Sequence, residues 1–174
     1  MVPVTDLPLT PLTGDLVVLE LLDPDEIADM LADPPRRRDE WHPEFPREDD
    51  RDGVRMAGEV SGWGSRRIVR RADGLVVGSV GFFGPPEPAD DGVPEVEVGY
   101  GLVAAARRQG LMRDALTVLL RLTDAAGVRV RGATTRDNEA SLASMRGAGF
   151  VVRDLLESPA DPEREVHLVR EPSP

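Results

Sequence analysis

The chain has 174 residues, of which 40% are apolar and 30% charged, as in an ordinary globular domain with a core of its own. The absence of cysteine excludes disulfides and thiolate metal sites and fits a reducing cytoplasm. A net charge of −11 argues against nucleic-acid binding and fits an amine-bearing partner, or solubility alone. No apolar run approaches the roughly 18 residues of a spanning helix and no secretory signal is present, so we expect a cytoplasmic protein without membrane contact.

Apolar periodicity predicts the elements of the chain. Residues 1–14 are spaced by prolines, which favours an extended segment, and residues 15–170 predict one domain. The predicted elements are, in order, a strand over 16–22, helices over 24–31 and about 48–60, strands over 66–71, 75–83 and 96–103, a helix over 112–126, a strand over 128–135, a helix over 138–145, and strands over 150–155 and 165–169. This order predicts an α/β fold with a mixed sheet flanked by about four helices.

The segment between the first two predicted helices is irregular and carries exposed-type aromatic residues. Irregular backbone with aromatic side chains often lines a pocket, so Trp41 and Phe45 are candidate substrate contacts. Alternatively, both rings close the core. The only two histidines, His42 and His167, lie far apart in the sequence, and we predict no metal site.

A strand, a short loop and an amphipathic helix follow one another between residues 96 and 126. The free N–H groups and the dipole of a helix N-terminus favour an anion, and Arg107 and Arg108 add positive charge. The pattern predicts a phosphate site, with an ordinary strand-to-helix turn as the alternative. Neither G-x-G-x-x-G nor Gly-Lys-Ser/Thr is present. The candidate anion-binding residues are Arg107, Arg108, Gln109, Gly110, Leu111 and Met112.

Several short motifs surround this loop in a specific order. They are Arg107-x-x-Gly110-x-Met112, Glu97-Val98-Gly99-Tyr100, Asn138-x-x-Ser141, Gly149-Phe150 and the stretch from Gly78 to Pro86. Across residues 16–169 the chain resembles GNAT-superfamily N-acyltransferases, and within them the branch of ribosomal-protein N-terminal acetyltransferases. The resemblance implies a single-domain, mostly antiparallel sheet of about seven strands, splayed in a V where the cofactor binds.

The resemblance also implies acetyl-CoA, or another short acyl-CoA, as co-substrate and a small-molecule or peptide amine as acceptor. The loop would then hold the pyrophosphate, the backbone of Leu102 and Val103 the pantetheine amides, and Asn138 and Ser141 further parts of the cofactor. A homodimer is the commonest assembly of such enzymes. Three positions depart from the family pattern. Met112 and Arg108 thicken the loop, and Met145 stands where several members keep a general-acid tyrosine.

The expected reaction is direct attack of an amine on the thioester. Glu97 is the candidate base, acting through water, because burial can raise the pKa of a strand carboxylate; Glu95 is the reserve. Ser141 could protonate the leaving thiolate or bond its own backbone, and Asn138 could be an N-cap alone. Phe83 and Glu97 join the aromatic pair as acceptor contacts. The rivals are a non-catalytic acyl-CoA-binding domain and a different phosphate binder, such as a small kinase.

Overall fold

The computed structural model describes residues 6–57, 60–154 and 165–173, and in this part of the chain nine strands form one sheet. Their order is β1-β2-β3-β4-β6-β7-β9-β8, with β5 paired to β6. The strands are β1 (Leu12–Thr13), β2 (Val17–Leu21), β3 (Ser65–Arg70), β4 (Val76–Phe82), β5 (Glu87–Pro88), β6 (Pro94–Leu102), β7 (Arg129–Thr135), β8 (Val151–Asp154) and β9 (Glu165–Arg170). The mixed α/β fold is confirmed; the two strands beyond the expected seven are β1 and β5, each of two residues.

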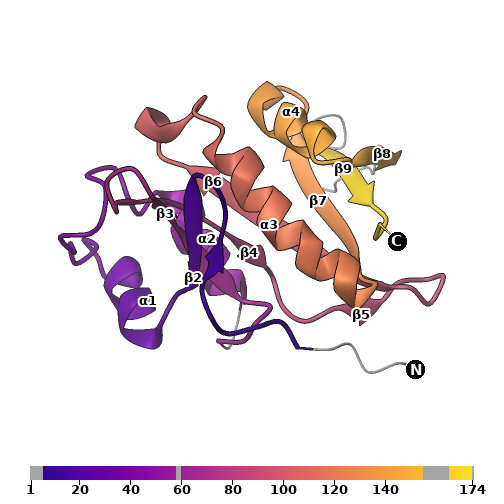
Figure 1. Cartoon of the computed structure of the whole chain (residues 1–174), viewed down its shortest axis with the longest axis horizontal. Helices are drawn as coiled ribbons and strands as arrows, with labels where there is room; N and C mark the ends of the chain where they lie inside the picture. Colours follow the sequence, from indigo (N-terminus) through magenta and orange to yellow (C-terminus); the bar gives the residue numbers. More distant parts are fainter. Residues whose placement is uncertain (1–5, 58–59, 155–164, 174) are drawn as a thin grey trace.

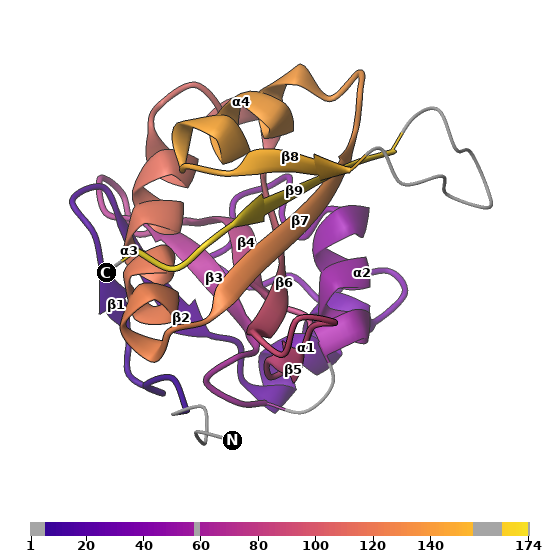
Figure 2. The same cartoon turned by 90° about the vertical axis from the view of Figure 1, so that its right-hand side faces the viewer.

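The helices cover both faces of the sheet (Figures 1 and 2). In Figure 2, α3 lies on one side of the central strands and α2 on the other. Four α-helices and one 3-10 turn are described: α1 (Pro24–Leu31), α2 (Glu48–Ala57), η1 (Ala104–Ala106), α3 (Leu111–Ala126) and α4 (Glu139–Gly147). Their order between the strands is the predicted one. No helix in the described part of the chain is long and apolar enough to cross a membrane.

Local sequence explains where α1 begins and where α3 ends. The Asp23 side chain caps α1 by accepting the Glu26 N–H at 2.8 Å, and Pro24 occupies the first helical position. Gly127 ends α3 in a left-handed conformation, φ 66°, as its sequence position predicts. The buried stripe of α3 follows helical spacing and comprises Leu111, Met112, Ala115, Leu116, Leu119, Leu120 and Thr123.

Strand β6 joins the two halves of the sheet. Its residues 98–102 pair with β4 in antiparallel register, whereas Glu95, Val96 and Glu97 pair in parallel with β7. Every other strand pair is antiparallel in the described chain. The parallel ladder ends at the pair Glu97–Arg131, and β7 continues alone along β9. Strands β6 and β7 therefore part into the predicted V, with its vertex at Glu97.

Candidate functional site

One edge of β6 faces the open V with unused backbone groups. Phe83 N–H donates to the Glu97 carbonyl at 3.1 Å and Val103 N–H to the Val77 carbonyl at 2.9 Å, so odd-numbered residues of β6 bond to β4. In an antiparallel ladder the alternate residues turn their backbone groups the other way. Those of Tyr100 and Leu102 thus point toward β7, beyond the last β6–β7 pair. This edge forms a row of donors and acceptors inside the V.

Leu102 and Val103, the predicted backbone contacts of the cofactor, differ in which of their backbone groups are already hydrogen-bonded. The Val103 N–H is used by Val77, and its carbonyl accepts from the Ala106 N–H at 3.0 Å. Both groups are held inside the protein, which leaves Val103 without a free backbone group for a cofactor. The Leu102 carbonyl accepts from Arg107 Nε at 3.2 Å, which ties the loop to the end of β6. The open edge includes the N–H of Leu102 and both backbone groups of Tyr100.

The loop before α3 has the geometry of an anion site. Arg108 and Gly110 both have left-handed backbone, with φ 61° and 78°, and such turns make neighbouring N–H groups converge. Gly110 is the N-cap and provides no side-chain bond, so the first N–H groups of α3 keep their donor capacity. Arg107 to Gly110 are exposed. The expectation that Met112 thickens the loop is wrong, because Met112 is only 8% exposed and packs into the core.

A contact distant in sequence holds this loop in place. The Asp114 carboxylate, in the first turn of α3, accepts the N–H groups of Asp15, Leu16 and Val17 at 3.2, 2.7 and 3.1 Å. A Cβ on Gly14 would lie 2.3 Å from the same carboxylate, so only glycine allows this approach. Sequence reasoning missed Asp114. Its position in the first helical turn, where an acid is favoured by the dipole, was the available signal.

The side chains of the odd-numbered residues of β6 point to one face of the sheet, which carries the candidate base and a groove. Residues Glu95, Glu97, Gly99 and Gly101 alternate along this face. A groove of about 370 Å³ is lined by Phe83, Gly84, Pro85, Glu87, Pro88, Ala89, Glu95, Val96, Glu97 and Arg131. The Phe83 ring lies on Gly99, where an added Cβ would meet the ring at 2.4 Å. The structure therefore brings together two of the predicted acceptor contacts, Phe83 and Glu97, at the vertex of the V.

The two carboxylates of this face differ in their surroundings. Glu97 is 29% exposed and pairs with Arg131 at 2.9 Å. Glu95 is 12% exposed and lies among three arginines, nearest to Arg153 at 2.6 Å; Arg129 and Arg131 are 3.6 and 3.7 Å away. The Glu95 carboxylate is thus enclosed by three guanidinium groups, whereas Glu97 has one ion-pair partner. Both carboxylates line the groove, and Glu97 is the more exposed of the two.

At the start of α4 the predicted cofactor contacts bond to the protein itself. Asn138 is the N-cap, and its Oδ1 accepts the Ser141 N–H at 3.1 Å. The Tyr100 hydroxyl lies 3.1 Å from both the Ser141 carbonyl oxygen and Ser141 Oγ. Burial raises the pKa of Tyr100, and the hydrogen bond from Ser141 offsets part of this effect. Tyr100 comes from β6 and Ser141 from the helix after β7, so this contact spans the V.

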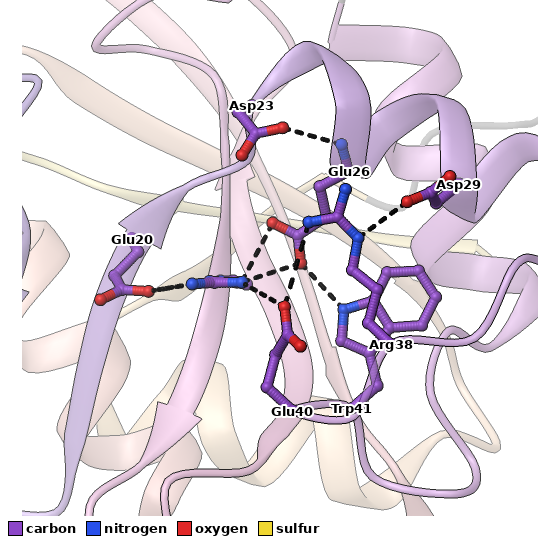
Figure 3. A network of polar contacts seen from close by, with 8 residues as sticks. Glu20, Asp23, Glu26, Asp29, Arg38, Glu40 and Trp41 are labelled. Carbon is purple, nitrogen blue, oxygen red and sulfur yellow. Dashed lines mark hydrogen bonds and ion pairs between the residues drawn. The ribbon is translucent and has the colours of Figure 1, made fainter.

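The two aromatic candidates Trp41 and Phe45 lie in the core, with exposures of 3% and 0%. Trp41 Nε1 donates to Glu26 Oε1 at 2.9 Å within a network of charged groups (Figure 3). Arg67 Nη1 donates to the same carboxylate at 3.1 Å, and Arg67 also pairs with Glu20 at 2.6 Å. These bonds fasten α1 and the irregular segment to the sheet. The burial of both rings supports the core alternative over the pocket.

No three histidine, aspartate or glutamate side chains are grouped to hold a metal ion within the ranges that the structure describes. Residues 16–151 match the family model described as acetyltransferase (GNAT) domain. The chain therefore belongs to the GNAT acetyltransferase family. No curated protein matches the chain in sequence.

Solved structures share the fold at low sequence identity. An acetyltransferase (GNAT family) from Bacillus anthracis has a TM-score of 0.63 and 12% identity, with 93% of this chain and 98% of that chain covered. For the ribosomal-protein-S5-alanine acetyltransferase from Vibrio fischeri the values are 0.62 and 13%, covering 94% and 97%. The microcin C7 self immunity acetyltransferase MccE, in complex with acetyl-CoA and AMP, gives 0.62 and 17%, covering 94% and 98%.

Proposed function

We propose that the protein is an acetyl-CoA-dependent N-acetyltransferase that acts on a primary amine of a small molecule or a peptide. One observation carries this proposal. Strand β6 leaves β7 directly after Glu97, so its unpaired edge leads from the exposed anion-type loop to a groove that contains a carboxylate. A long cofactor with phosphates at one end and a thioester at the other matches this path.

The loop residues Arg107 to Met112 would hold the pyrophosphate of the cofactor. Their N–H groups and the N-terminus of α3 supply hydrogen bonds, and the exposed arginines supply charge. The pantetheine arm would run along the open edge of β6 and bond the backbone of Leu102 and Tyr100, in the manner of an added strand. The acetyl-CoA bound to MccE, which shares the fold, supports this choice of cofactor.

The acceptor amine would enter from the groove on the other face of the sheet. Glu97 takes a proton from the ammonium through a water molecule, because an ammonium has no lone pair with which to attack. The free amine then attacks the thioester carbonyl directly. A β6 N–H that faces the V would stabilise the oxyanion. Phe83 covers the strand beside Glu97 and limits the space for the acceptor.

Release of CoA thiol from acetyl-CoA, measured with a panel of amines that includes amino acids, polyamines and peptide N-termini, tests this proposal. At least one amine should accelerate thiol release, and the acetylated amine should appear in equal amount. Acetyl-CoA binding without turnover of any amine would instead support a non-catalytic acyl-CoA-binding domain. Tighter binding of ATP than of acetyl-CoA would contradict the cofactor.

A further inference from the structure

Position 145, where the resemblance implies a general-acid tyrosine, holds a methionine that cannot supply a proton. Met145 is buried on α4, and its Cε lies 2.7 Å from where a Cβ on Gly132 would stand. The side chain thus packs against β7 as part of the core. A thiolate that leaves the tetrahedral intermediate would need a proton from elsewhere.

The only tyrosine of the chain, Tyr100, reaches the same helix from the opposite arm of the V. Its hydroxyl meets the first turn of α4 at Ser141, at 3.1 Å from the backbone oxygen and from Oγ. Residues four apart lie on one face of a helix, about 6 Å apart along its axis. The Tyr100 hydroxyl is therefore about one helical turn from position 145.

The backbone of Tyr100 also belongs to the edge along which the pantetheine would lie. Its N–H and carbonyl face the V, midway between Leu102, next to the loop, and Glu97 at the vertex. At about 3.3 Å per residue, Tyr100 stands some 10 Å from the candidate base. The thioester would lie between the loop and the groove, and the contact between Tyr100 and Ser141 joins the two arms of the V along this path.

We propose that Tyr100 is the residue that protonates the departing CoA sulfur, with Ser141 as the residue that positions its hydroxyl. This inference rests on the proposed function of the site. It replaces the role considered for Ser141 as the proton donor. Without cofactor the Tyr100 proton is directed to the Ser141 carbonyl; with cofactor it turns to the sulfur while the Ser141 hydroxyl continues to donate to the phenolic oxygen.

The amine nitrogen bonds to the carbonyl carbon, and the carbon–sulfur bond breaks with its electron pair left on sulfur. The Tyr100 O–H proton passes to sulfur, which gives the free thiol, and the phenolate regains a proton from water. The nitrogen loses two protons in all: Glu97 takes the one from the ammonium through water, and the one released as the amide forms passes to water, which balances the proton returned to the phenolate. The hydrogen bond from Ser141 stabilises the short-lived phenolate.

Kinetics of Tyr100→Phe test the role directly, because this change removes one hydroxyl and keeps the ring. We expect kcat to fall about 100-fold, while KM for acetyl-CoA stays within about twofold. Ser141→Ala, which leaves the tyrosine in place, should lower kcat by about tenfold. A kcat for Tyr100→Phe equal to that of the wild type would overturn the proposal.

A spectroscopic test needs no acceptor and separates this inference from the proposed function. Biosynthetic 3-fluorotyrosine gives a single ¹⁹F signal, because the chain has one tyrosine. Saturating CoA should shift this signal, and a CoA analogue with hydrogen in place of the thiol should shift it far less. Equal shifts with both ligands would show that Tyr100 does not contact sulfur. Failure of every amine in the turnover assay would refute the proposed function whatever the ¹⁹F result.

Discussion

Glu97 and Arg131 form the last pair of the β6–β7 ladder, and their side chains meet with Oε2 and Nη2 2.9 Å apart. The two strands separate directly beyond this pair. The ion pair therefore fixes a carboxylate at the vertex of the V, between the open backbone edge and the groove. Its guanidinium partner is 49% exposed, so the pair remains in contact with solvent.

Replacing Glu97 by Gln should remove the proton acceptor and keep the shape of the side chain. We expect kcat to fall by about 10²-fold or more, with acetyl-CoA affinity within about threefold of the wild type. Asp90→Asn, an exposed neighbour outside the groove lining, is the control and should keep normal kcat. A wild-type pH–rate profile in Glu97→Gln would remove Glu97 as the base.

The loop assignment predicts that a negative charge at Gly110 prevents cofactor binding. Gly110→Glu should abolish CoA binding in calorimetry through like-charge repulsion with the pyrophosphate. Gly110→Ala is the matched control, because it carries the same strain at φ 78° without the charge. It should fold with a cost of about 1 kcal/mol and retain binding. Equal CoA affinities of Gly110→Glu and the wild type would contradict the loop as a phosphate site.

Trp41 should act on stability and leave substrate affinity unchanged. Trp41→Ala should lower the free energy of unfolding by about 3–5 kcal/mol in urea titrations, because it empties a core position. Trp41→Phe keeps most of the ring but leaves buried Glu26 without its indole donor, which should cost about 1–3 kcal/mol. The KM of Trp41→Phe for the amine should match the wild type. A tenfold higher KM at unchanged stability would restore Trp41 as a pocket residue.

The Asp124 carboxylate should make the free energy of unfolding depend on pH in the acid range. Its carboxylate bonds Arg170 at 2.6 and 2.9 Å and accepts the Ser173 N–H at 2.8 Å, which joins the end of α3 to the end of β9. The Arg170 bonds hold the pKa of Asp124 below its ordinary 3.8. The contribution is thus complete above the unfolded pKa and is lost as the pH falls through the native pKa.

Asp124→Asn should therefore destabilise the protein by about 2 kcal/mol at pH 7, and the difference should shrink below about pH 3. Urea titrations at both pH values measure this. Asp90→Asn, at an exposed site, should show no such difference. A deficit in Asp124→Asn that is the same at pH 7 and at pH 2.5 would mean that packing, and not charge, accounts for the effect.

Periodicity predicted the long elements because their burial follows the period of a helix or a strand. The stripe of α3 and the left-handed Gly127 are examples. The short strand β5 was not predicted, because Glu87–Pro88 has no apolar periodicity and pairs only because β6 lies beside it. The side-chain contact from Trp41 to Glu26 could not be predicted, because fifteen residues of chain separate the partners.

The candidate site was predictable as a set of motifs and not as a geometry. Sequence spacing gave the order of Glu97, Gly110 and Ser141 along the chain. It did not predict on which side of the sheet each residue lies. In the structure Met112 is buried in the core, and the Asp114 carboxylate on α3 accepts hydrogen bonds from the turn after β1. Contacts between residues about 98 positions apart depend on the assembled sheet, and no local pattern reports them.

Three residue pairs alone hold the two arms of the V together as a β-ladder. A ligand that bonds to the free edge of β6 would add hydrogen bonds to those of the ladder and stabilise the contact between the two half-sheets. Ligand and fold are then thermodynamically linked, and a ligand at 100 times its Kd would raise the stability by about 2.7 kcal/mol. The melting temperature of the protein should accordingly rise with the concentration of the co-substrate.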